Sequence, residues 1–421
     1  MPSMPPDAAA LNNLGQSLAA RGDRTSAIQC FRQAISQDPH DERAYHNLAM
    51  ILFWEDRLDE SIQLFQRALV LKPIDAIGHY NLGTVLMEMN RLDSAIAEFE
   101  RAATLDPKLA NATWNLSWAL LKQGRLTEGW RFYEARWHMR EWQALRRFPQ
   151  PLWDGSDLAG KRILLHTEQG FGDAIQMARF VPMVAARGGT VYLDCLPQLR
   201  SLFSNIDGAS RVIASGESLP PYDVQCPLMS LPGRLGITLE SIPQHVPYLS
   251  ANPSRVEHWG PRIAGDSGKL KVGLAWSGRA YPVGRSIEPA VLSPLLSISD
   301  VKFYGLNVAG EDSAVSASLH AANFADLGPV LTDFAETAAV LMNLDLIITI
   351  DTAVAHLAGA LGRPTWLLLR FAPDWRWMLE RADSPWYPTM KLFRQQVRND
   401  WRGPIAQVVG ELSPLSHAQP R

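Results

Sequence analysis

The sequence has few cysteines and almost no surplus of charge. Its three cysteines, Cys30, Cys195 and Cys226, stand far apart in 421 residues, so they form neither a disulfide framework nor a metal-binding knuckle. The 40 Lys and Arg residues are offset by 43 Asp and Glu residues, which leaves a net charge of −3. Nucleic-acid binding needs a positively charged contact surface, so the composition argues against a nucleic-acid partner.

Long hydrophobic runs are missing as well. The most apolar region, residues 344–369, is interrupted by Asp345, Asp351, His356 and Arg363, whereas a membrane-spanning helix needs about 20 consecutive apolar residues. The N-terminus has no apolar core of the kind found in signal peptides. We therefore expect a cytoplasmic protein without a membrane span, and its length suggests two or three domains.

Residues 1–140 repeat with an interval of 34. Prolines, leucines and aromatic residues recur at this spacing: Pro39, Pro73 and Pro107; Leu14, Leu48, Leu82 and Leu116; Phe31, Phe65, Phe99 and Tyr133. Within each unit, apolar residues fall at helical spacing on two segments that a turn separates. This pattern is that of the tetratricopeptide repeat, so it predicts an all-α solenoid of four units with the leucine column packed inside.

A polar column accompanies the repeats. It consists of four asparagines at the same interval: Asn13, Asn47, Asn81 and Asn115. Adjacent helical residues point about 100° apart, so the asparagines cannot share the buried direction of the leucines that follow them. The column is either a solvated face or a ladder of amides that holds the backbone of a protein or peptide acceptor in the groove of the solenoid.

Residues 161–421 alternate short apolar strands with helical segments, the pattern of parallel, doubly wound sheets. The expected strands lie at 163–165, 191–193, 212–213 and 223–224, then at 271–276, 302–306, 344–350 and 364–369. They predict one Rossmann-like layer over 161–250 and a second over 251–421, after an ordered, aromatic-rich linker over 141–160. Two such layers imply a ligand-binding cleft at their strand ends.

The first layer has a glycine turn directly after its first strand. Gly170 and Gly172 flank a single residue, which lets the backbone turn tightly and lets a substrate approach it. Two carboxylates, Glu168 and Asp173, stand at the same strand end. A strand followed by Gly-x-Gly and a helix is equally typical of a purely structural turn, so both interpretations stay open.

The second layer contains the apolar run 346–350, followed by Asp351, Thr352 and Ala353 at the start of a helix of small residues. The free amides at a helix N-terminus form an anion site suited to a diphosphate. His356 lies one turn further on, within reach of the same phosphates. The alternative interpretations are that Asp351 only caps the helix and that His356 is a buried structural histidine.

These two motifs, together with Gly362-Arg363-Pro364, resemble the bacterial heptosyltransferase-like glycosyltransferases of family 9 over roughly residues 160–400. The tandem with tetratricopeptide repeats is similar in layout to O-GlcNAc transferase. The resemblance implies a GT-B fold and an inverting, metal-independent sugar transfer from a nucleotide-diphosphate donor bound in the C-terminal half. It also implies that Asp173 is the base and that Thr352 and His356 contact the diphosphate.

The residues themselves favour the same chemistry. Residues 160–421 contain no Asp-x-Asp motif to hold a metal ion, so helix amides and an arginine must stabilise the leaving phosphate. Arg279, Arg285 and Arg376 are the candidates, and neither a metal nor a cofactor is expected besides the nucleotide sugar. One carboxylate, Asp173 or Glu168, must take the proton of the acceptor.

Two other functions remain open. The chain is alternatively a non-catalytic repeat scaffold with a degenerate transferase domain, or a sugar-nucleotide epimerase or hydrolase. The sequence identifies neither the sugar nor the acceptor.

Overall fold

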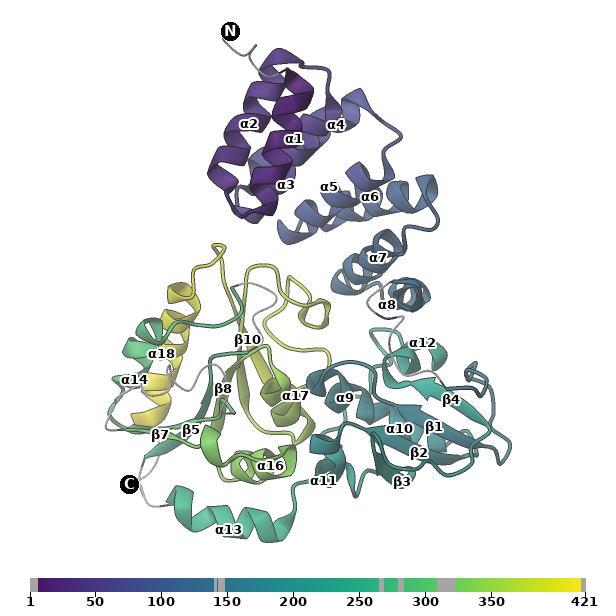
Figure 1. The fold of residues 1–421 in the computed structure, drawn as a ribbon. Helices are drawn as coiled ribbons and strands as arrows, with labels where there is room; N and C mark the ends of the chain where they lie inside the picture. Colours follow the sequence, from purple (N-terminus) through teal and green to yellow (C-terminus); the bar gives the residue numbers. More distant parts are fainter. Residues whose placement is uncertain are drawn as a thin grey trace. The chain divides into compact units, whose positions relative to one another are not determined.

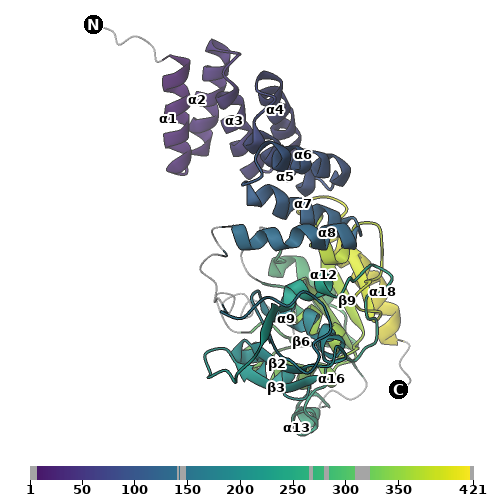
Figure 2. The ribbon, with the colours of Figure 1, turned by 90° about the vertical axis from the view of Figure 1, so that its right-hand side faces the viewer.

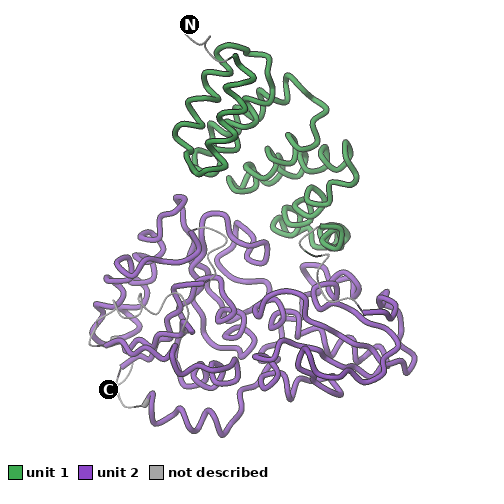
Figure 3. The backbone as a smooth tube through the Cα atoms, in the orientation of Figure 1, with its two compact units in different colours: residues 1–144 green, residues 145–421 purple. Residues whose placement is uncertain are grey.

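The computed structural model describes residues 7–139, 142, 148–264, 269–278, 284–308 and 323–417. It forms two compact units, residues 1–144 and 145–421 (Figure 3). Within the described ranges, no helix is long and apolar enough to cross a membrane.

Unit 1 is a series of antiparallel helix pairs (Figures 1 and 2). Its helices are α1 Ala8–Ala20, α2 Arg24–Gln37, α3 Glu42–Trp54, α4 Leu58–Leu71, α5 Ala76–Glu88, α6 Leu92–Leu105, α7 Ala110–Lys122 and α8 Leu126–Tyr133, followed by the 3₁₀ turn η1 Glu134–His138. The predicted tetratricopeptide architecture is confirmed.

Small residues let the two helices of each pair approach closely. A Cβ on Gly15 would lie 2.6 Å from the ring of Phe31, and one on Gly83 would lie 2.7 Å from the ring of Phe99. In the fourth pair the Ser117 hydroxyl instead donates to the Gly129 carbonyl at 2.9 Å. The 34-residue recurrence of small and aromatic residues is therefore a packing requirement between helices.

The leucine column is buried in three units only. Leu48, Leu82 and Leu116 are at most 4% exposed, whereas Leu14 is 47% exposed. The prediction that the leucine column is packed inside is therefore wrong for Leu14. Leu48 packs against Phe31 of the preceding pair. In the described part of the chain no helix pair precedes α1, and Leu14 therefore lacks this cover.

The first half of unit 2 is a four-stranded parallel sheet in the order β3-β2-β1-β4. Its strands are β1 Arg162–His166, β2 Thr190–Cys195, β3 Ala209–Ala214 and β4 Val224–Pro227; its helices include α9 Phe171–Met177, the 3₁₀ turn η3 Ala178–Phe180, α10 Val181–Ala185, α11 Arg200–Phe203 and α12 Leu231–Arg234. The Trp153 amide donates to the Gln225 carbonyl at 2.8 Å. The end of the predicted linker thus packs against this half.

The second half is a six-stranded parallel sheet in the order β10-β9-β8-β5-β6-β7. Its strands are β5 Leu270–Ala275, β6 Val301–Gly305, β7 Phe324–Asp326, β8 Leu346–Ile350, β9 Thr365–Leu369 and β10 Met390–Arg394; its helices include α13 Pro253–Ala264, α14 Ser293–Leu296, α16 Phe334–Met342, α17 Ala353–Ala360 and α18 Arg402–His417. Strand β8 is buried throughout, because parallel sheets are covered on both faces. The predicted pair of α/β layers is confirmed.

The two halves of unit 2 meet along α9 and α17 (Figure 1). Tyr248, in the segment that connects the halves, forms a hydrogen bond with each half. Its amide donates to the Ala360 carbonyl at 3.0 Å, and its hydroxyl donates to the Ile175 carbonyl at 3.0 Å. The strand ends that carry the two predicted motifs consequently face each other.

Candidate functional site

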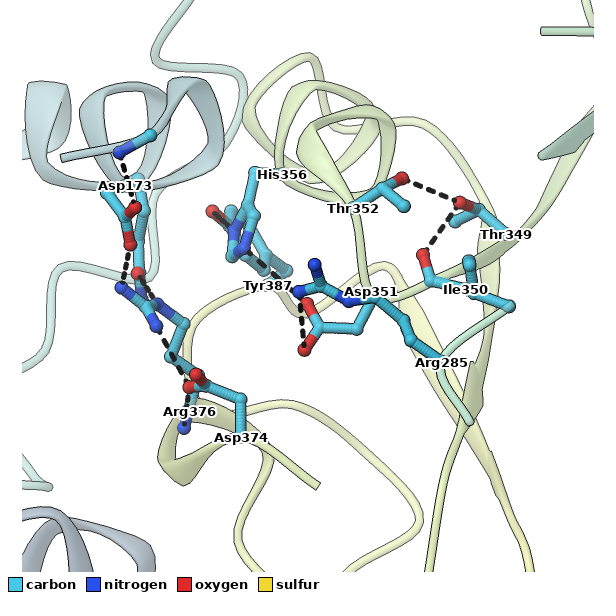
Figure 4. Close-up of polar contacts among 12 residues, drawn as sticks. Asp173, Arg285, Thr349, Ile350, Asp351, Thr352, His356, Asp374, Arg376 and Tyr387 are labelled. Atoms are coloured by element: carbon cyan, nitrogen blue, oxygen red, sulfur yellow. Dashed lines mark hydrogen bonds and ion pairs between the residues drawn. The ribbon is translucent and has the colours of Figure 1, made fainter. Parts of the chain in front are cut away.

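Asp173 lies in the first turn of α9, where both of its carboxylate oxygens accept hydrogen bonds. Oδ2 accepts from the Gly170 amide at 2.8 Å, which satisfies one of the free amides at the start of the helix. Oδ1 accepts from the guanidinium of Arg376, which belongs to the other half (Figure 4). The Asp173 side chain keeps 24% of its surface exposed, so it is fixed but still accessible.

Gly172 contacts α17 directly. A Cβ at this position would lie 2.6 Å from Cδ2 of His356 and 3.5 Å from the Cα of Ala353. The sequence left two interpretations of Gly170 and Gly172 open, a close approach of a substrate and a structural turn. In the structure the missing side chain of Gly172 makes room for a helix–helix contact.

His356 is 5% exposed. Its Nδ1 lies 2.9 Å from the Tyr387 hydroxyl, and its ring stacks on Trp377 with centroids 5.4 Å apart. Burial, reinforced by the charges of Arg376 and Arg179, holds the pKa of His356 well below its ordinary value. The imidazole is therefore neutral at pH 7 and offers a hydrogen bond, not a positive charge.

Asp351 does not cap α17. Thr352 is the N-cap residue, while the Asp351 carboxylate lies 4.0 Å from Nη2 of Arg285 and 3.9 Å from Nε2 of His356 (Figure 4). Burial and the nearby carboxylate of Asp374 raise the pKa of Asp351 to about 6. The position before the helix thus carries a carboxyl group that is easily neutralised.

Helix α17 has eight residues, and its N-terminus is the predicted anion site. Thr352 makes no side-chain capping bond to it, and its hydroxyl lies 3.4 Å from that of Thr349. Ala353 is the first helical residue. The structure thus brings Arg285, Asp351, Thr352, Ala353 and His356 together, whereas Arg279 lies outside the described residues.

Glu168 bonds to a backbone amide within the first half of unit 2. Its Oε1 accepts a hydrogen bond from the Met229 amide at 3.2 Å, so the carboxylate ties the end of β1 to the segment after β4. Asp173 is bonded to Arg376 of the second half.

Four residues at this site were not predicted. Gln176 and Arg179 follow Asp173 at intervals of three along the mostly apolar segment of α9 and η3, Tyr387 bonds to His356, and Asp374 bonds to Arg376. Polar residues spaced by three along an apolar segment are a signal that could have revealed the first two. No local pattern indicates Tyr387.

The asparagine column lies between successive first helices of unit 1. Nδ2 of Asn47 donates to Oδ1 of Asn12 at 2.9 Å, and Nδ2 of Asn81 lies 3.0 Å from Nε2 of His46. Asn115 bonds similarly to Thr84 at 3.3 Å, while Asn13 is exposed. Three of the four asparagines thus join neighbouring repeats, and none is fully buried.

Two family models match parts of this chain. The tetratricopeptide repeat model matches residues 12–76 and 80–135. The model of glycosyltransferase family 9 (heptosyltransferase) matches residues 309–372, which include Asp351, Thr352 and His356. The chain therefore combines tetratricopeptide repeats with a glycosyltransferase family 9 region.

A curated relative and solved structures are also similar. Protein FlbA of Caulobacter vibrioides is 27% identical over 311 residues, which cover 68% of this chain and 52% of the relative. The chain thus spans about half the length of that protein. The crystal structure of MamA is 25% identical in sequence, with a TM-score of 0.31. The match covers 32% of this chain and 80% of the MamA chain. YrrB, described as a tetratricopeptide protein with an unusual peptide-binding site, is 21% identical over 32% of this chain and 70% of its own, with a TM-score of 0.30.

Proposed function

We propose that the protein is an inverting, metal-independent glycosyltransferase that moves a sugar from a nucleotide-diphosphate donor to a protein acceptor. The observation that carries this proposal is the contact of α9 with α17. It brings the carboxylate of Asp173 and the N-terminus of the family 9 helix to the same place. A base for the acceptor and an anion site for the leaving group are the two parts that the reaction needs.

The donor diphosphate binds at the start of α17. The amides of the first turn, from Ala353 onward, and the guanidinium of Arg285 surround its oxygens. His356 contributes a neutral hydrogen bond through Nε2, because its Nδ1 is engaged by Tyr387. Asp351 opposes an anion only while it is ionised.

Asp173 removes the proton of the acceptor hydroxyl as that oxygen bonds to the anomeric carbon. The bond from this carbon to the donor phosphate breaks on the opposite face, and its electron pair leaves with the nucleoside diphosphate. The anomeric configuration is thereby inverted. Glu168 is the alternative base, although one of its oxygens accepts a hydrogen bond from the Met229 amide.

The repeats hold the acceptor. The side-chain oxygens of Asn47, Asn81 and Asn115 accept hydrogen bonds from the acceptor backbone. Their Nδ2 groups are already bonded to residues of the preceding first helix. A ladder of amides recognises backbone groups, so it binds many sequences and leaves the choice of the modified residue to the transferase domain.

A non-catalytic scaffold is the second candidate. It is compatible with the structure because both carboxylate oxygens of Asp173 already have hydrogen-bond partners within the protein. A scaffold of this kind would still bind nucleotides but would not turn over a donor.

A panel of nucleotide sugars tested by thermal unfolding distinguishes these functions. A donor present at ten times its Kd adds about 1.4 kcal/mol to the free energy of unfolding. We expect one class of nucleotide sugar to stabilise the wild type and the control Arg381→Ala, but to stabilise Arg285→Ala less. Stabilisation without donor turnover would favour the scaffold, and no stabilisation by any donor would contradict both functions.

A further inference from the structure

Arg376 joins the two halves of unit 2 at the candidate base. Its side chain is buried, and each of its three guanidinium nitrogens donates to a different residue (Figure 4). Nη2 donates to Oδ1 of Asp173, Nε donates to Oε1 of Gln176, and Nη1 donates to Oδ1 of Asp374 at 2.9 Å. The guanidinium is thus held between two carboxylates, one from each half.

The helix that receives Arg376 carries a buried polar stripe. Two buried polar residues follow Asp173 at intervals of three: Gln176 in α9 itself and Arg179 in the 3₁₀ turn η3 that comes directly after it. Gln176 is fully buried, and Arg179 donates to the Gln176 carbonyl at 3.0 Å and to the Trp386 carbonyl at 2.7 Å. Buried polar groups are costly unless they are paired. Oε1 of Gln176 and Nη1 of Arg179 find partners in the second half, which are Arg376 and the Trp386 carbonyl.

The segment that presents Arg376 is also held in place. The guanidinium carbon lies 4.4 Å from the ring centre of Trp375. Arg394 donates to the carbonyls of Trp377 at 2.6 Å and Met378 at 2.8 Å. Met378 has a φ of 52°, a conformation that costs energy in a non-glycine residue and persists where the surroundings enforce it. The Arg376 side chain is therefore presented in one fixed orientation.

These contacts argue against a role for Arg376 on the donor. Its charge is already offset by Asp173 and Asp374, so a diphosphate gains little attraction from it. We propose that Arg376 is a positioning residue for Asp173. The guanidinium holds Oδ1 while the Gly170 amide holds Oδ2, so the carboxylate keeps one orientation toward the acceptor hydroxyl. This inference rests on the proposed function, in which Asp173 is the base.

The test compares Arg376→Lys and Arg376→Gln in the wild type and in Asp173→Asn. Lys keeps the charge but lacks the planar guanidinium, whose three separate nitrogens reach Asp173, Gln176 and Asp374. Arg381→Gln is the matched control. It removes an arginine close to Arg376 in the sequence, and the partner of that arginine is Asp383. Thermal unfolding checks that each variant folds. Calorimetry with UDP, GDP and ADP measures nucleotide affinity, and the nucleotide sugar that stabilises the wild type most is the donor for turnover.

We expect Arg376→Lys to lower turnover at saturating donor at least tenfold, with nucleotide affinity and donor KM within twofold of wild type. In the Asp173→Asn background the same change should cost nothing further, because Arg376 acts through that carboxylate. An equal loss in both backgrounds would overturn the inference in favour of a purely structural role. Weaker nucleotide binding with unchanged turnover would overturn it in favour of a donor contact. If the wild type binds none of the three nucleotides, the proposed function itself fails.

Discussion

Gly172 and His356 are in direct contact: a Cβ on the glycine would lie 2.6 Å from Cδ2 of the imidazole. The histidine ring cannot easily move aside, because it stacks on Trp377 and bonds to Tyr387. The close packing of α9 on α17, and with it the meeting of the two candidate motifs, therefore depends on the absence of a side chain at residue 172.

Gly172→Ala tests this packing. We expect the free energy of unfolding to fall by about 1–3 kcal/mol, the usual cost of an added methyl group in a filled interior. Gly410→Ala is the control, since it lies in α18 with no atom within 4 Å of an added Cβ. Helix propensity predicts a small gain there. Equal effects of the two changes in urea unfolding would contradict the contact.

The raised pKa of Asp351 predicts a pH dependence of stability. Its pKa in the folded protein is about 6, against an ordinary 3.8, because of burial and the carboxylate of Asp374. The folded state binds this proton more tightly, so the stabilisation is complete below about pH 4 and is lost as the pH rises through 6. Between pH 4 and pH 7 the stability of Asp351→Asn should therefore gain up to about 3 kcal/mol relative to wild type.

His356→Gln should show the opposite trend. The lowered pKa of His356 favours the neutral ring in the folded state, so its stabilisation is present above about pH 6.5 and is lost as the pH falls. Relative to wild type, this variant should lose stability between pH 4 and pH 7. Urea unfolding at both pH values measures the two trends, and differences that do not change with pH would contradict the assigned environments.

The asparagine column predicts one effect on stability and one on activity. Asn81→Ala removes a bond to His46 and should lower the free energy of unfolding by about 0.5–1.5 kcal/mol. Asn13→Ala should change it little, because Asn13 is exposed. Replacement of all four asparagines should reduce modification of the protein acceptor at least tenfold while donor hydrolysis continues. Unchanged acceptor modification, measured where the variant is folded, would show that the column only joins the repeats.

The sequence predicted the repeats and the two sheets because each depends on a local pattern: the 34-residue interval in one case, and apolar runs ending in turns in the other. Strands β7 and β10 were missed because β7 has only three residues, and because Lys391 and Arg394 interrupt the apolar run of β10. The glycine turn was found, and its role was left open between a substrate site and a structural turn. A missing side chain at residue 172 is equally compatible with an approaching substrate and an approaching helix.

The site itself was predicted only in part, for a related reason. Asp173, Asp351 and His356 stand in recognisable motifs, whereas their partners do not. Arg376 contacts Asp173 across 203 positions, and Arg179 donates to the Trp386 carbonyl across 207. Contacts that form only when two halves of a domain pack together leave no periodicity in the sequence.

The central claim is that Asp173 is the base of a sugar transfer to protein. Its most direct test is labelled transfer into a lysate of native cells that lack this gene, with the nucleotide sugar that stabilises the wild type most as donor. We expect the wild type to label protein, and Asp173→Asn to bind the donor equally well but to label protein 10²–10⁴-fold more slowly. Labelling by Asp173→Asn at the wild-type rate would contradict the claim and would leave Glu168 as the candidate base.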